Sequence, residues 1–145
     1  MKISNRFTIA THMLIIIAIK GRESKVTSDF LAASVGVNPV IIRKTLSQLK
    51  KAGLISVARG TGGTEIIKDL QDISLFDVYQ AVECLGKSGK LFSFHDNPNP
   101  NCPVGANIHK VLDQKLLDVQ VAMENQLRQM SLAQVVADAE ARIVK

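Results

Sequence analysis

Apolar side chains recur at intervals of three and four residues near the start of the chain, which predicts a helix from Asn5 to Lys20. Ser4 is the expected N-cap of this helix, and Gly21 is its expected C-cap. A second, shorter helix is expected to begin after Thr27, whose hydroxyl can cap it, and to end at Gly36. The predicted apolar face of this second helix consists of Phe30, Leu31 and Val35.

The strongest local pattern is "NPVIIRKTLSQLKKAG", which predicts a third helix from Pro39 to Ala52. Asn38 is the expected N-cap, and Pro39 occupies the first helical position, where its missing N–H is not needed. Gly53 follows the expected end of the helix. The buried stripe is expected to consist of Ile42, Leu46 and Leu49. Two helices joined by a short turn that contains glycine are typical of a helix-turn-helix.

The segment that follows the third helix favours a β-hairpin. "LISVA" and "TEIIK" are rich in β-branched residues and flank the cluster "RGTGG" at residues 59–63. A loop that binds a nucleotide phosphate is the alternative for such glycines. That loop needs a lysine after its last glycine, or a G-x-G-x-x-G spacing, and then a helix, and neither pattern is present. A helix-turn-helix followed by a hairpin is a winged helix, with Arg59 at the wing tip.

The second half of the chain predicts three further helices. Ser74 and Asp77 are placed to form a capping box at the start of a helix of about ten residues. An irregular loop rich in proline and glycine follows, and Pro103 then begins a helix of about 28 residues. Ser131 is expected to cap a last short helix. The long helix carries an apolar seam of Ile108, Leu112, Leu116, Val119, Met123, Leu127 and Met130.

These elements predict a mainly α fold with a small β-hairpin, divided into three parts. Residues 1–83 would form a winged helix-turn-helix domain, residues 84–102 a loop that can act as a sensor region, and residues 103–145 the long helix and the C-terminal helix. A 28-residue helix is about 42 Å long, more than a domain of this size covers by itself. Part of the helix is expected to fold back on its own domain. The predicted homodimer contact consists of Ile108, Leu112, Leu116, Val119, Met123 and Leu127.

The positive charge belongs to the first half of the chain. Residues 1–70 hold eleven Lys and Arg against four Asp and Glu, a net charge of +7, whereas residues 71–145 hold seven against nine, a net charge of −2. Such an asymmetry favours a partner that is a polyanion, although each lysine taken alone can simply be solvated. The predicted contacts with double-stranded DNA are Thr27, Ser28, Val40, Arg43, Lys44, Ser47, Arg59 and Gly60.

Other classes of protein are disfavoured. No apolar run approaches the roughly 20 residues of a membrane helix, and no small-residue cleavage site follows the N-terminus. Two cysteines, Cys84 and Cys102, suit a reducing cytoplasm better than a secreted disulfide scaffold. The chain contains no nucleophile elbow, metalloprotease helix or kinase motif. We therefore expect a soluble cytoplasmic protein that is not an enzyme.

Five segments of the chain, taken in order, carry a resemblance to a known family. They are "KISNRFTIATHML", "NPVIIRKTLSQLKKAGLI", "RGTGGTEIIKD", "ISLFDVYQAV" and "NPNCPVGANI". The sequence resembles the Rrf family of bacterial winged-helix transcription regulators (IscR, NsrR and CymR types), and most closely its YwnA-like branch. The resemblance implies a homodimeric repressor or regulator whose long helix forms the dimer interface. It places Val40, Arg43 and Lys44 on the recognition helix and Arg59 on the wing.

One departure from this family concerns its cofactor. Its cluster-binding members hold an iron-sulfur cluster with three cysteines in the loop before the long helix, and this loop holds only Cys102. We therefore expect no cluster, and the sequence also disfavours a bound metal because no C-x-x-C pair is present. Three interpretations of Cys102 remain open: a thiol switch at a helix start, a metal ligand together with His95 and His109, or a cysteine without chemistry.

The leading functional hypothesis is a sequence-specific DNA-binding regulator, a homodimeric repressor whose DNA binding responds to a signal, with thiol oxidation at Cys102 as the candidate. The alternative is a redox or small-ligand sensing module that acts mainly through a protein partner.

Overall fold

The elements follow the order that the sequence predicts. The computed structural model describes residues 3–59 and 62–143. In these residues the elements are α1 (Arg6–Lys20), α2 (Ser28–Val35), α3 (Pro39–Lys51), β1 (Ile55–Val57), β2 (Thr64–Ile66), the short 3-10 helix η1 (Leu70–Asp72), α4 (Leu75–Ala81), α5 (Pro103–Arg128) and α6 (Leu132–Ile143). The prediction of a mainly α fold with one small antiparallel hairpin is confirmed.

Capping side chains determine where three of the helices begin. The Thr27 hydroxyl accepts a hydrogen bond from the Phe30 N–H at 3.2 Å, and the Asn38 side chain accepts one from the Val40 N–H at 2.8 Å. Ser74 and Asp77 form the predicted capping box, because each side chain accepts a hydrogen bond from the other residue's backbone N–H. All three caps are confirmed.

Two predicted helix boundaries are wrong. Asn5, rather than Ser4, is the N-cap of α1, because the Ser4 hydroxyl turns to accept hydrogen bonds from the N–H and Nε of Arg6. The α4 helix has seven residues instead of about ten. It ends early because Glu83 takes a left-handed backbone conformation with φ of 48°, which no helix continues.

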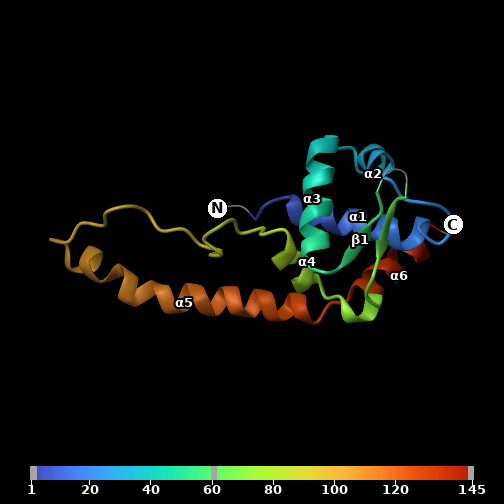
Figure 1. Cartoon of the computed structure of the whole chain (residues 1–145). Coiled ribbons are helices and arrows are strands. Elements are labelled where there is room, and N and C mark those ends of the chain that lie inside the picture. The colour runs from blue at the N-terminus through green and yellow to red at the C-terminus, as the bar shows by residue number, and fades with distance from the viewer. Residues whose placement is uncertain (1–2, 60–61, 144–145) are drawn as a thin grey trace.

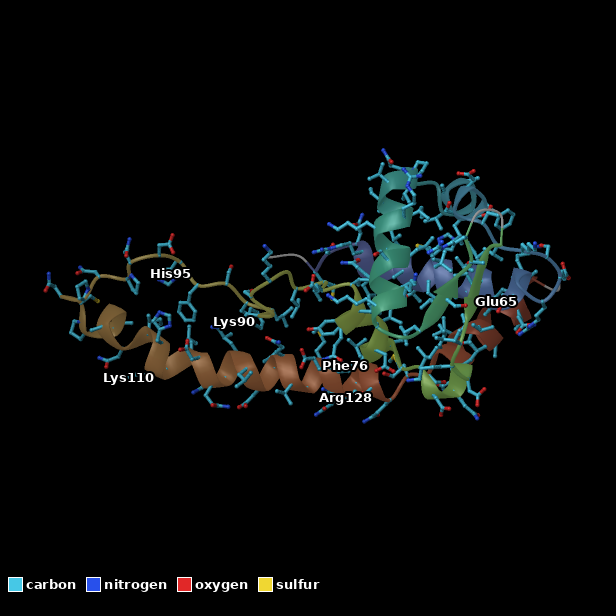
Figure 2. The ribbon with its side chains drawn as sticks, viewed as in Figure 1. Glu65, Phe76, Lys90, His95, Lys110 and Arg128 are labelled. Carbon is cyan, nitrogen blue, oxygen red and sulfur yellow. The ribbon has the colours of Figure 1, made fainter. Side chains whose placement is uncertain are left out.

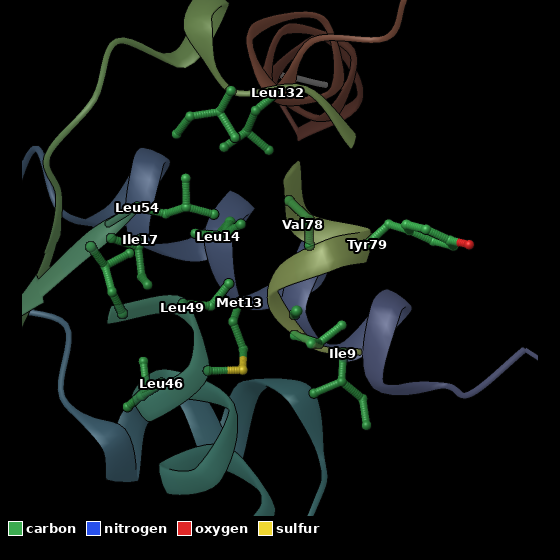
Figure 3. Packing of buried hydrophobic residues seen from close by; sticks show 14 of the residues in the cluster. Ile9, Met13, Leu14, Ile17, Leu46, Leu49, Leu54, Val78, Tyr79 and Leu132 are labelled. Carbon is green, nitrogen blue, oxygen red and sulfur yellow. The ribbon is translucent and has the colours of Figure 1, made fainter. Parts of the chain in front are cut away.

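The core lies where α1, α3, α4 and α6 meet (Figure 3). The predicted stripe of α3, formed by Ile42, Leu46 and Leu49, is buried. One residue of the predicted apolar face of α2 is not buried. Phe30 is 42% exposed, whereas the adjacent Leu31 is fully buried. The reason is geometric, since adjacent residues of a helix point about 100° apart and the short α2 helix buries only one stripe.

The C-terminal helix returns to this core. The Leu132 N–H donates to the Ile73 carbonyl at 2.7 Å, and the Leu75 N–H donates to the Met130 carbonyl at 2.8 Å. Leu132 and Val136 are buried where α6 packs against α1 and η1. The N-terminal elements and α6 therefore share one hydrophobic core, although the predicted division places them in different parts of the chain. The division itself stays a prediction.

The α5 helix and the loop before it project from the rest of the molecule as an arm (Figure 1), which we define as residues 87–119. The base of α5 is fixed to α4 beyond the arm. The Arg128 guanidinium lies 3.8 Å from the centre of the Phe76 ring (Figure 2), and the Tyr79 hydroxyl donates to Glu124 at 2.8 Å. No residue of α5 is fully buried. The arm therefore leaves apolar side chains exposed that an ordinary monomer would cover.

Candidate nucleic-acid interface

The exposed face of α3 begins at its first turn. Val40 is 61% exposed, and Arg43, Lys44 and Ser47 are also exposed. The opposite face is buried, and Thr45, which sequence analysis did not assign to the core, turns its hydroxyl back to the Ile41 carbonyl at 2.8 Å. Burial of one face fixes the direction of the other, so two basic side chains and one apolar side chain point away from the protein. This composition suits the major groove, where Arg reads guanine and an apolar group contacts the thymine methyl.

The start of α2 offers a second, smaller group of donors. Thr27 caps this helix through its hydroxyl, and Ser28 is its first residue. The first N–H groups of a helix have no partner within the helix and attract anions such as phosphate. In a helix-turn-helix the first helix crosses the DNA backbone. The predicted role of Thr27 and Ser28 in contacting phosphate is therefore compatible with the fold, and it stays a prediction.

The wing is attached to the segment that precedes α2. In the hairpin, Ser56 pairs with Glu65 and Val57 with Thr64. The Thr64 N–H and hydroxyl both donate to the Val26 carbonyl, at 2.8 and 3.0 Å. Gly63 has φ of 81°, and a Cβ there would lie 3.1 Å from the Val26 N. This close approach explains why glycine occupies the position and holds the wing in a fixed relation to α2.

Arg59 is exposed and lies two residues after the end of β1. The predicted contact at Gly60 falls outside the described residues. In the part of the chain that the structure describes, the two salt bridges join Arg22 to Glu140 and His109 to Asp113. Arg43, Lys44 and Arg59 take no part in them, so their charges are available to an anionic partner.

The predicted dimer seam divides into two sections. Met123 and Leu127, near the end of α5, pack against the protein's own core. Ile108, Leu112 and Leu116 are half-buried, and Val119 is 51% exposed. The arm therefore presents an apolar face, continued by exposed Val104 and Val111, that its own domain leaves uncovered.

The two cysteines occupy different environments. Cys84 is buried after α4, and burial raises the pKa of its thiol. Cys102 is exposed and is the N-cap of α5. The backbone N–H groups of Gly105 and Val104 hold the pKa of the Cys102 thiol below its ordinary value. Among residues 3–59 and 62–143, no three His, Cys, Asp or Glu side chains gather as metal ligands. Thiolates ordinarily hold an iron-sulfur cluster, and the chain offers one exposed and one buried thiol, so the expected absence of a cluster stays a prediction.

A hydrogen-bonded group that sequence analysis missed joins the loop to α5 and α4. The Gln120 side chain accepts from the Leu91 N–H at 2.9 Å and donates to the Gly89 carbonyl at 2.8 Å. The same amide donates to Glu124 at 3.1 Å, and Glu124 accepts from the Tyr79 hydroxyl. Burial and the hydrogen bond with Glu124 raise the pKa of Tyr79. The sequence carries no signal for this group, because its links between α4, the loop and α5 join residues that are 29 to 45 positions apart in the chain.

A scan against protein-family models matches residues 3–138 to Rrf2, described as an iron-dependent transcriptional regulator. YwnA of Bacillus subtilis strain 168, by name an HTH-type transcriptional regulator, is 43% identical over 133 residues, 92% of this chain and 96% of YwnA.

Two solved structures extend the likeness to the fold. A crystal structure described as that of a DNA-binding protein is 37% identical with a TM-score of 0.69, covering 90% of this chain and 97% of the other. A crystal structure described as that of a transcriptional regulator from Lactobacillus plantarum is 28% identical with a TM-score of 0.77, covering 94% and 90%. No helix within the described residues is long and apolar enough to cross a membrane.

Proposed function

Because the chain belongs to the Rrf2 family of transcriptional regulators, we propose that it is a homodimeric repressor that binds a specific DNA operator in the cytoplasm. DNA-binding regulation, not enzymatic catalysis, is the activity of this family. The observation that carries the proposal is the exposed face of α3, where Arg43 and Lys44 stand on a helix whose opposite face is buried. Arg59 supplies a further cation from the wing.

The uncovered apolar face of the arm supports the proposed dimer. A 26-residue helix is about 39 Å long. Pairing two such helices about a two-fold axis covers the exposed apolar side chains of both copies. It also supplies two recognition helices, which half-sites one turn of DNA apart require.

Binding of the full-length protein to DNA tests the proposal directly. Selection from a random DNA library is expected to yield one palindromic sequence, and a gel shift with the region upstream of the protein's own gene is expected to show specific retardation. Recovery of library sequences without any shared preference would overturn the proposal of a specific regulator.

Arg59→Ala is expected to lower affinity for the selected operator by about threefold to tenfold while leaving the fold intact. Arg59 is exposed and its guanidinium takes part in neither salt bridge of the described residues, so the loss is expected to reflect one contact with phosphate or the minor groove. The measurement is a fluorescence-anisotropy titration at fixed salt. Lys115→Ala, which removes a cation from α5, is the matched control. Unchanged affinity of the Arg59 variant would refute this placement of the wing.

The thiol of Cys102 is the proposed signal site. Its lowered pKa favours the thiolate, which is the nucleophilic form. With hydrogen peroxide, the thiolate sulfur forms a bond to one oxygen while the O–O bond breaks, which yields a sulfenic acid and hydroxide. Oxidation removes the negative charge that the first N–H groups of α5 stabilise, at the point where the loop enters the helix.

Peroxide is expected to release the operator from the parent protein and not from Cys102→Ser. Because the thiol pKa is lowered, the rate of oxidation should rise with pH and level off at a lower pH than for an ordinary cysteine. The measurement is operator binding after timed peroxide exposure at several pH values. Cys84→Ser is the control variant, since Cys84 is buried. An equal response of Cys102→Ser and the parent would contradict the thiol switch.

The regulator is further proposed to work without an iron-sulfur cluster, because the described cysteines comprise one buried and one exposed thiol. Protein purified under anaerobic conditions is expected to be colourless, with less than one iron atom in ten chains. The measurement combines a visible absorption spectrum with iron and sulfide analysis. A broad absorption band with stoichiometric iron and sulfide would show that cluster ligands come from elsewhere.

A further inference from the structure

A cavity of about 380 Å³ lies in the arm, between loop residues 88–94 and the middle of α5. Figure 2 shows Lys90 and His95 on the loop segment that runs beside this helix. The cavity's apolar walls come from both sides, with Phe92 and Phe94 on the loop and Leu116 and Leu117 on α5. A volume of this size lies in the range of small-molecule sites, which begins at about 300 Å³.

The two sides of the cavity are held together by directional contacts. The Gln120 side chain binds the loop at both Gly89 and Leu91 and so fixes the distance between loop and helix. The Phe94 ring lies on the His109 ring, with 4.1 Å between the centroids. The His109 Nδ1 lies 3.1 Å from a carboxylate oxygen of Asp113, which orients the imidazole. The cavity is therefore formed before any ligand enters.

The polar groups around the cavity offer mainly donors. The one acidic side chain, Asp113, is already in contact with His109. Lys90 forms no salt bridge with any described residue. The Ser88 hydroxyl oxygen accepts from the Lys90 N–H, which leaves its own hydrogen for a ligand. An unpaired ammonium group beside exposed aromatic and aliphatic surface complements an anion that carries a flat apolar body.

We propose that this cavity binds a small aromatic carboxylate. The ring of the ligand covers Phe92 and Leu117, which are 42% and 50% exposed, and the carboxylate lies against the Lys90 ammonium group. The proposal goes beyond DNA binding, because it concerns a second ligand at a site on the arm. It is independent of whether the protein recognises an operator.

The test uses the full-length protein and 1-naphthoate as the probe. Isothermal titration is expected to show saturable binding, and the neutral analogue 1-naphthalenemethanol should bind at least tenfold more weakly. Lys90→Ala is expected to weaken naphthoate binding about twofold to fivefold, the range for a charged contact open to solvent. Lys87→Ala, which removes a cation from the same loop outside the cavity lining, should leave the affinity unchanged.

Four outcomes would overturn the proposal. Absence of saturable binding, or equal affinity for the neutral analogue, would show that the cavity does not select an anion. Equal losses of naphthoate affinity in Lys90→Ala and Lys87→Ala would show that the loss comes from the change in net charge and not from a contact with Lys90. The variant Val119→Glu is designed to separate the two copies of the proposed dimer. Binding of naphthoate by this variant but not by the parent would show that the second copy covers the cavity. A specific gel shift without naphthoate binding would reject this ligand site alone and would leave the proposed DNA-binding function standing.

Discussion

Replacing Val119 by glutamate is expected to convert the dimer into a monomer and to lower affinity for the operator by about a hundredfold or more. Val119 lies in the middle of the apolar seam of α5 and is 51% exposed. Its replacement therefore costs the fold of the single chain little stability. In the proposed dimer the new carboxylate would be buried in an apolar contact, which is strongly unfavourable without a partner. Sedimentation equilibrium and an anisotropy titration with operator DNA measure the two effects.

The control for this variant is Asn125→Glu. Asn125 is exposed on the same helix and lies about 120° from Val119 around its axis, outside the apolar seam, so its variant adds the same charge away from the seam. Circular dichroism and the midpoint of thermal unfolding show whether either variant disturbs the fold. A Val119→Glu protein that stays dimeric and binds its operator normally would place the dimer contact elsewhere.

Local chemistry explains why the helix starts of the winged helix could be predicted so closely. Asn38 followed by Pro39, and Ser74 followed by Asp77, each place a capping group and the N–H it binds within three residues. The exposed face of α3 could be predicted in the same way, since the spacing of Ile42, Leu46 and Leu49 determines which side remains outside. The side chains of α3 proposed to meet DNA are therefore identified by periodicity alone.

The parts that prediction missed depend on contacts between distant segments. Phe30 is apolar and adjacent to a core residue, yet its exposure depends on how α2 lies against α1 and α3. The contacts of Gln120 with Gly89 and Leu91 join residues that are about thirty positions apart and belong to no repeating pattern. The same is true of the cavity beside them. Sequence patterns report the secondary structure of each segment, whereas such sites arise from how two segments pack.

These contacts give a physical route from the arm to the DNA-binding elements. The loop is bound to Gln120, Gln120 to Glu124, and Glu124 to Tyr79 on α4. Tyr79 is buried in the core that α4 shares with α1 and α3. A signal that moves the loop, whether a ligand in the cavity or oxidation at Cys102, would change the hydrogen bonds that hold α4. Coupling between the two sites then requires that operator DNA change the affinity of the arm for its ligand by the same factor.

Arg43→Ala is expected to lower affinity for the operator by about 1–3 kcal/mol, which is roughly fivefold to 150-fold, and to relax the choice of base at one position in each half-site. Arg43 lies one turn into α3, where the recognition helix of a helix-turn-helix meets base edges, and no described residue neutralises its guanidinium. Affinity for random DNA should fall much less, because phosphate contacts carry most of that binding. The measurement is a pair of titrations, with operator and with random DNA, at one salt concentration.

Lys51→Ala is the matched control, because Lys51 is an exposed cation in the last turn of the same helix. A contact of Lys51 with phosphate would lower affinity for operator and random DNA by the same factor. The two variants therefore separate recognition of bases from attraction to the backbone on a single helix. An equal loss on both kinds of DNA for Arg43→Ala would move Arg43 from the base edges to the phosphates, and Lys44 would then be the remaining basic side chain on this face that could select the operator.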